Sequence, residues 1–146
     1  MSKVEQDSAA KNPAKGSSKI KWIVAGLLLV FAGAAAMMLP RGFSDDLSLV
    51  GKGKVAVVLV RDKNAVESFD MLEVMNGIRD QYAGQVEFLL TDFNTPEGRA
   101  FISANKAARV TMVVLDANGN TLNVLYPRQT AESVKQVIDG ALGVAK

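Results

Sequence analysis

The chain has 146 residues, 49% of them apolar and 22% charged, which suits one small folded domain with an accessory segment. It contains no cysteine and no histidine, so disulfides, thiol nucleophiles, imidazole bases and the usual ligands of zinc, copper and haem are excluded. Residues 1–40 hold five lysines against two acidic residues, whereas the rest of the chain holds twelve basic against thirteen acidic residues. A nearly neutral remainder without a basic stripe argues against binding to nucleic acid.

The N-terminal segment reads as a tail followed by a membrane span. Residues 1–19 are polar and lack apolar periodicity, so we expect a disordered cytoplasmic tail. Within residues 20–39, eighteen successive uncharged residues begin at Trp22, which is enough helix to cross a hydrocarbon layer and bind the lipid bilayer. Because Lys19 and Lys21 precede Trp22, the positive-inside rule predicts a single-pass signal-anchor that leaves the C-terminal part across the membrane.

A cleaved signal peptide is the alternative interpretation of the same segment. The run "AGAAA" offers small-residue cleavage sites after Ala34 and after Ala36. Against cleavage, the apolar stretch is longer than the usual apolar region of a signal peptide, and the polar region before it is also long. These lengths favour an uncleaved anchor.

The globular domain is expected over residues 54–146, behind a linker at residues 40–53 that carries turn formers and charges. The continuous β-branched run Val55–Val60 predicts a strand covered on both faces. A helix should follow, with a reciprocal N-terminal cap formed by Asn64 and Glu67. Its apolar positions at helical spacing are Phe69, Leu72, Met75, Ile78 and Tyr82.

The remaining elements complete an α/β pattern. Val86–Asp92 predicts a second strand, and the helix between the two strands implies that they are parallel. Thr95 should cap a short second helix, and residues 110–126 should form a β-hairpin around an Asn-Gly turn. A last helix is expected after Thr130. The element order is therefore β-α-β-α-β-β-α.

This order resembles the thioredoxin fold over essentially all of the globular part. The segments that carry the resemblance are "IRDQYAGQVEF", "VTMVVLDANGN" and "TAESVKQVI", which are similar to the family's helix end with its following strand, its hairpin and its last helix. The resemblance implies a thioredoxin-like α/β domain preceded by one N-terminal transmembrane helix. Similarity to membrane-tethered thioredoxins of the bacterial envelope implies an inner-membrane protein whose domain lies in the periplasm.

The functional positions of that family are not filled by the expected residues. The family's Cys-x-x-Cys falls on Ala65-Val66-Glu67-Ser68, its buried acid on Leu59, its cis-proline on Thr111 and its last glycine on Pro127. Thiol-disulfide exchange needs a thiolate and a resolving thiol, and the chain has neither. We therefore expect no catalytic residue, no metal and no cofactor.

The resemblance also implies that three loops meet at one end of the sheet. Our hypothesis is that this end binds an acidic or extended segment of a protein partner in or near the membrane, by charge contacts and backbone pairing. The candidate residues are Arg61, Lys63, Asn64, Ala65, Val66, Ser68, Arg109, Val110, Thr111 and Arg128. The alternative is that these are solvated loop residues.

The sequence thus predicts a redox-inactive, membrane-tethered thioredoxin-like domain that acts as an interaction adaptor, assembly factor or accessory subunit. One alternative is a thioredoxin-fold enzyme, or a redox accessory protein that works with a partner's cysteines. Another is that the transmembrane helix itself is the working part, because Gly26 and Gly33 would let it pack into a larger membrane complex.

Overall fold

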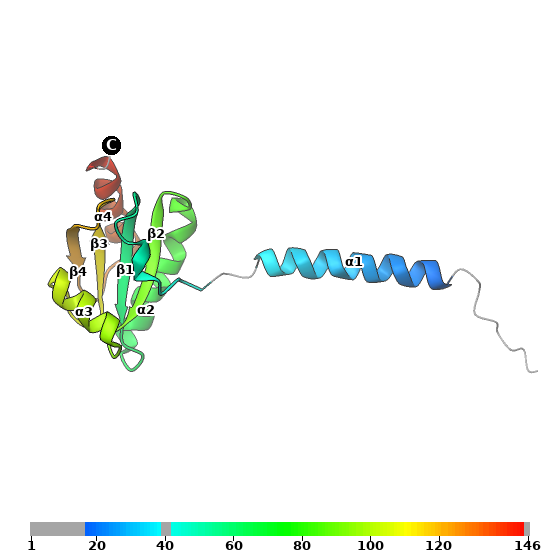
Figure 1. The fold of residues 1–146 in the computed structure, drawn as a ribbon, viewed down its shortest axis with the longest axis horizontal. Helices are drawn as coiled ribbons and strands as arrows, with labels where there is room; N and C mark the ends of the chain where they lie inside the picture. Colours follow the sequence, from blue (N-terminus) through cyan, green and yellow to red (C-terminus); the bar gives the residue numbers. More distant parts are fainter. Residues whose placement is uncertain (1–16, 39–41, 145–146) are drawn as a thin grey trace, which may run out of the picture. The chain divides into compact units, whose positions relative to one another are not determined.

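The computed structural model describes residues 17–38 and 42–144, which belong to two compact units, residues 1–41 and 42–146 (Figure 1). The tail expected at residues 1–19 therefore falls almost entirely outside the described residues. Leu39, the last residue of the expected span, also falls outside them, as do the first two residues of the expected linker.

The first unit contains a single described helix, α1 (Ser17–Met38). Twenty of its residues, Ser18–Met37, make it long and apolar enough to cross a membrane. Its large apolar side chains are exposed, including Trp22 at 79% and Phe31 at 72%. Such a continuous apolar surface is unfavourable in water, so α1 is a candidate membrane span.

The second unit is built on a four-stranded sheet in the order β2-β1-β3-β4. The strands are β1 (Val55–Arg61), β2 (Val86–Asp92), β3 (Thr111–Leu115) and β4 (Thr121–Leu125). β1 pairs in parallel with β2 and antiparallel with β3, and β3 pairs antiparallel with β4. The parallel pair and the hairpin predicted from the sequence are both confirmed.

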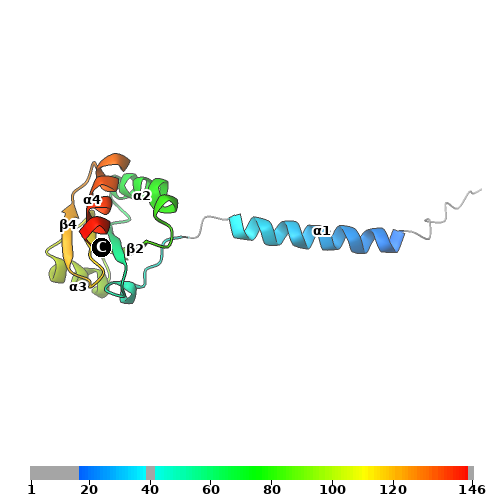
Figure 2. The same cartoon turned by 90° about the horizontal axis from the view of Figure 1, so that it is seen from above.

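Helices cover both faces of this sheet. They are α2 (Val66–Ile78), a 3₁₀ turn η2 (Arg79–Tyr82), α3 (Pro96–Asn105) and α4 (Ala131–Val144). The helices α2 and α4 cover one face, and α3 covers the other (Figure 2). Alternate residues of β1 enter the two core clusters, and none of Val55–Val60 is more than 1% exposed. The prediction of a strand buried on both faces is therefore confirmed.

Two of the predicted helix caps are present. The hydroxyl of Thr95 accepts a hydrogen bond from the Gly98 N–H at 3.0 Å, and the hydroxyl of Thr130 accepts one from the Ser133 N–H at 3.2 Å. Each satisfies a donor that the first turn of a helix otherwise leaves without a partner.

The start of α2 differs from the prediction. Its N-cap is Ala65, which makes no side-chain hydrogen bond, so the cap expected from Asn64 and Glu67 was wrong. The Asp62 carboxylate instead accepts from the Asn64 N–H at 2.9 Å, and the Ser68 hydroxyl accepts from the Asp62 N–H at 2.9 Å. Because these bonds turn Ser68 inward, the buried stripe of the helix runs from Ser68 through Met71, Met75 and Ile78. Phe69 was expected in the core and is 58% exposed.

The expected linker is folded from Gly42 onward, and residues 42–53 are called the covering segment below. The Leu90 N–H of β2 donates to the Ser44 carbonyl at 2.9 Å, and the Phe43 and Phe88 rings lie 6.4 Å apart. A 3₁₀ turn, η1 (Leu47–Leu49), follows and packs against the core on the α3 face. The turn formers and charges of this segment obscured the few apolar side chains that hold it on the domain.

Candidate functional site

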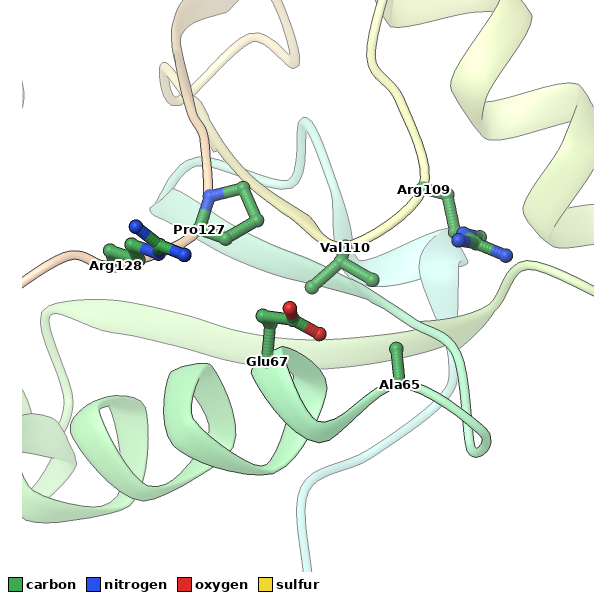
Figure 3. Close-up of a pocket in the computed structure, with 6 residues that line it drawn as sticks. All are labelled: Ala65, Glu67, Arg109, Val110, Pro127 and Arg128. Atoms are coloured by element: carbon green, nitrogen blue, oxygen red, sulfur yellow. The ribbon is translucent and has the colours of Figure 1, made fainter.

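A pocket with a volume of about 260 Å³ lies at one end of the sheet (Figure 3). Its lining residues are Ala65, Glu67, Arg109, Val110, Pro127 and Arg128. They come from the three loops that the sequence predicted would meet. In Figure 3, Arg109 and Arg128 lie at opposite ends of the group, with Glu67 and Val110 between them.

Each element places its lining residue for a local reason. Ala65 is the N-cap of α2 and Glu67 lies in its first turn, whereas Val110 immediately precedes β3. Val110 has a backbone φ of 56° and Arg128 one of 72°, both in the left-handed region. That conformation is unfavourable for a β-branched residue such as valine, so the surrounding loop must hold it. The Thr111 hydroxyl does so in part, because it donates to the Ala108 carbonyl at 2.8 Å.

An ion pair between the buried Asp62 carboxylate and Arg109, whose side chain is 58% exposed, joins two of the loops. The Arg109 guanidinium lies 3.1 Å from the Asp62 carboxylate, whose side chain is only 6% exposed. The same guanidinium lies 5.9 Å from the centre of the Phe93 ring. Without Arg109 the buried Asp62 carboxylate would lose its cation, so Arg109 has a structural role at the pocket wall.

Lys63 is engaged outside the pocket. Its ammonium group lies 3.2 Å from the Asp92 carboxylate. The Asn94 N–H, which donates to that carboxylate, holds the pKa of Asp92 below its usual range, and Lys63 lowers the pKa further. Lys63 is therefore committed to the end of β2 and is not a pocket residue.

The charges at the pocket largely offset one another. Arg109 is paired with Asp62, and the lining contains the Glu67 carboxylate as well as Arg128. Among the described residues, Arg128 has no ion pair, which leaves it available to a carboxylate from outside. The sequence suggested a strongly positive surface, because it places three arginines and Lys63 in these loops. In the structure the surface carries both positive and negative groups.

The ten candidate residues divide into three groups in the structure. Ala65, Arg109, Val110 and Arg128 line the pocket. Ser68 and Thr111 are buried and hydrogen-bonded within the domain. The others lie outside the lining: Arg61 is half-buried at the end of β1, and Lys63, Asn64 and Val66 are exposed.

The ten candidate residues chosen from the sequence omit three residues of this region. Glu67 and Pro127 line the pocket, and Phe69 is exposed one turn after Val66, which is itself 71% exposed. A second set of residues at helical spacing, Ser68, Met71 and Met75, could have shown that Phe69 lies on the exposed side of α2. Of the predicted stripe, Met75, Ile78 and Tyr82 are buried and Leu72 is half-buried, so the assignment to the core was wrong only for Phe69.

This site lacks the thiols on which thiol-disulfide exchange depends. The chain has no thiol, and Ser68 is 1% exposed with its hydroxyl bonded to the Asp62 N–H. Within residues 17–38 and 42–144, no group of three or more carboxylates could hold a metal ion. A mixed wall of two guanidinium groups, one carboxylate and apolar carbon is suited to binding a protein segment.

Comparison with known proteins defines the fold class. The sequence matches no protein-family model and no curated protein. A thioredoxin-like protein from Clostridium perfringens matches with a TM-score of 0.57 at 12% identity, over 71% of this chain and 91% of that one. A thiol:disulfide interchange protein of the thioredoxin family from Chlorobium tepidum TLS matches with 0.52 at 17% identity, over 70% and 92%. Fasciola hepatica thioredoxin matches with 0.52 at 17% identity, over 62% and 84%.

The second unit therefore has a thioredoxin-like fold, as the sequence resemblance indicated. Its particular feature is the absence of cysteine from the whole chain. Because exchange begins with attack by a thiolate, this chain supplies no group that could carry out the reaction.

Proposed function

We propose that this protein is a redox-inactive, membrane-anchored thioredoxin-fold protein that binds another protein as an adaptor, assembly factor or accessory subunit at the periplasmic face of a bacterial inner membrane. The supporting observation is the pocket, with two exposed apolar side chains beside it in the first turn of α2. Its lining residue Ala65 falls where the resemblance aligns the first of the family's thiols, and Glu67 lies within the same four-residue motif.

The size and surroundings of the pocket favour a protein over a small molecule. Its volume of about 260 Å³ is below the range of about 300–1,000 Å³ that is typical of small-molecule sites. Val66 and Phe69 are 71% and 58% exposed at the start of the same helix. An exposed aromatic side chain beside a concave wall is a common anchor in protein interfaces.

The partner is expected to present an extended segment with a carboxylate. Val110 lies outside the β1–β3 ladder, which begins at Thr111, so an incoming strand can pair beside it. Arg128 supplies the cation for the partner's carboxylate, since Arg109 is paired with Asp62.

The anchor makes a weak contact sufficient. A membrane-spanning α1 confines the domain and its partner to one surface, which raises their effective concentration without any new contact. Lys19 and Lys21 before the apolar stretch favour a cytoplasmic N-terminus and a periplasmic domain. Accessibility of the C-terminus to protease in intact spheroplasts would test that orientation.

The main test is affinity purification of the full chain, C-terminally tagged, from membranes in mild detergent, followed by mass spectrometry. Two variants address the site, Phe69→Ser and Arg128→Glu. Their matched controls are Asn76→Ser, exposed on the same helix, and Lys52→Glu, exposed in the covering segment. Charge reversal at Arg109 is less informative, because it would place a carboxylate beside buried Asp62.

The proposal expects a stoichiometric partner with the wild type and both controls. Each site variant should reduce its recovery about tenfold, the loss that corresponds to an anchor side chain worth about 1.4 kcal/mol. Retention of the partner by both site variants would contradict docking at this pocket. Reduction of insulin disulfides by the purified chain would instead support the enzymatic alternative.

A further inference from the structure

The exposed face of α2 begins at the pocket and continues along the helix beyond it. We propose that this face binds a basic segment of the same protein partner, so that the partner presents a carboxylate to Arg128 and lysine or arginine side chains to the carboxylates of α2. The inference rests on the proposed function, because it describes the chemistry of that partner. It adds residues to the site that do not line the pocket.

The residues in question form one stripe at helical spacing. Val66, Phe69, Asp70 and Glu73 are all exposed, and they stand at positions i, i+3, i+4 and i+7. They are called the exposed stripe below. The buried stripe of the same helix packs into the core on the sheet. The exposed stripe thus begins with two large apolar side chains and continues with two carboxylates.

Negative charge on α2 is not balanced within the chain. Residues 66–82 contain four acidic residues and one cation, Arg79, whose guanidinium lies over an aromatic ring of the covering segment. None of Glu67, Asp70 and Glu73 forms an ion pair with another described residue. These three carboxylates are therefore available to cations from outside the chain.

The spacing of these carboxylates does not stabilise the helix that carries them. Asp70 lies three residues after Glu67 and three residues before Glu73, so like charges are neighbours on the helix surface and repel one another. No lysine or arginine occurs in α2 to offset them. Glu67 in the first turn complements the helix dipole, but Asp70 and Glu73 lie beyond that turn. A local cost without a gain inside the chain is typical of residues that serve binding.

Charge complementarity favours a basic protein segment over other occupants of this face. The carboxylates would repel nucleic acid and anionic lipid headgroups. Two-fold pairing with a second copy of α2 would bring the same carboxylates together. Val66 and Phe69 need apolar carbon against them, which the long stems of lysine and arginine supply, and a guanidinium also stacks on an aromatic ring.

Glu67 connects the exposed stripe to the pocket. It lines the pocket, and Figure 3 shows it between Arg109 and Arg128, above the start of α2. A partner that contacts both regions must therefore change charge along its length. An acidic residue is expected opposite Arg128, and basic residues are expected opposite Asp70 and Glu73.

The test uses the full chain, C-terminally tagged and captured from membranes in mild detergent. Capture is done at about 0.1 M and about 1 M salt, at which charges are screened over about 10 Å and about 3 Å. The test variant is Asp70→Asn/Glu73→Gln, which removes two charges with little change in shape. Its matched control is Asp45→Asn/Glu97→Gln, which removes two exposed carboxylates elsewhere that have no ion pair with a described residue.

The proposal expects the wild type and the control to recover the partner equally. At the lower salt concentration the test variant should recover about fivefold less, the loss expected from two exposed ion pairs. At the higher concentration this difference should shrink, because screening weakens the pairs that the wild type makes. Circular dichroism would establish that the test variant is folded, since removing neighbouring like charges should not reduce its helix content.

A second measurement reads the chemistry of the bound segment directly. The chain has no cysteine, so Val66→Cys provides a single thiol that can carry a benzophenone photo-crosslinker. Irradiation of membranes and mass spectrometry of the adduct identify the peptide that lies on the exposed stripe. That peptide should contain lysine or arginine close to the point of attachment.

The outcomes separate this inference from the proposed function. If the partner is lost from Arg128→Glu but kept by the test variant, the basic segment is refuted and the proposed function stands. A loss of equal size at both salt concentrations would also overturn the inference, since it would not be electrostatic. An adduct with a second copy of this chain, with lipid or with an acidic segment would do the same. If the wild type recovers no partner, both proposals fail.

Discussion

The two edges of the sheet are treated differently by the chain. At β2, the covering segment supplies the Ser44 carbonyl to the Leu90 N–H at 2.9 Å, and Lys54 pairs with Glu87 at 3.2 Å. The Arg79 guanidinium lies 4.5 Å from the centre of the Phe43 ring on the same side. At β4, no described residue pairs with the outer side of the strand, and no side chain of the strand is charged.

This difference shows that the chain covers one edge of the sheet with its own residues, whereas no described strand lies beside the other edge. The closed edge is held by backbone bonding, aromatic packing and ion pairs that all come from within the domain. The open edge has none of these and keeps exposed apolar side chains at Leu122 and Tyr126. Substitutions at the β2 side should therefore reduce the stability of the folded chain, whereas substitutions of exposed residues on β4 should change that stability little.

The largest effect is expected at Gly98, where α3 approaches the end of β2. A Cβ added there would collide with the backbone carbonyl oxygen of Asp92, which cannot move aside as a flexible side chain can. Gly98→Ala should lower the free energy of unfolding by about 3 kcal/mol. Gly77→Ala in α2 is the matched control, because its Cβ would meet nothing within 4 Å. That change should raise the free energy of unfolding by about 0.5–1 kcal/mol.

Urea unfolding of the full chain in mild detergent, followed by circular dichroism, measures both changes. If the two alanine variants unfolded at the same urea concentration, the close approach of α3 to the end of β2 would be refuted.

A smaller change in the free energy of unfolding is expected at the β2 edge than at Gly98, and a still smaller one at the β4 edge. Phe43 is half-buried against Phe88 and Arg79, so Phe43→Ala should lower the free energy of unfolding by about 1.5–2 kcal/mol, less than for a fully buried phenylalanine. Leu122→Ala removes an apolar side chain at the open edge and should change it by less than about 0.5 kcal/mol. Equal losses in the same urea assay would mean that the covering segment does not close its edge.

Much of this fold could be predicted from the sequence because its signals are local. The β-branched run at Val55–Val60, the caps at Thr95 and Thr130 and the hairpin turn each depend on neighbouring residues. The covering segment could not be predicted in this way, since Phe43 is held by residues far along the chain. Its pairing with β2 depends on tertiary contacts that no periodicity reports.

The candidate site was only partly predictable for the same reason. The resemblance indicated which loops would meet, and Ala65, Arg109, Val110 and Arg128 line one pocket. It could not show that Asp62 would engage Arg109 or that Asp92 would engage Lys63, because those pairs depend on side-chain geometry. The exposure of Phe69 follows from the inward hydrogen bond of Ser68, and it was overlooked because two stripes that share Met75 both have helical spacing.

The last prediction concerns Tyr82, which packs beside β2 on the covered side, and its effect appears only at high pH. Its hydroxyl donates to the Asp139 carboxylate at 2.8 Å, and its ring lies 6.4 Å from that of Phe88. Burial, reinforced by the hydrogen bond to Asp139, raises the pKa of Tyr82 to about 12. An unfolded tyrosine has a pKa of about 10, so the folded chain holds this proton to a higher pH than the unfolded chain does.

The sign of the effect on stability follows from that order of pKa values. The stabilisation is fully present below about pH 10, where Tyr82 is protonated in both states, and it is lost as the pH rises from about 10 to about 12. Tyr82→Phe cannot ionise, so the difference in melting temperature between wild type and Tyr82→Phe should shrink over this interval. Tyr126→Phe at the open edge is the matched control and should retain the wild-type loss. A difference between wild type and Tyr82→Phe that stayed constant from pH 8 to pH 12 would show that the Tyr82 proton is not held by the folded chain.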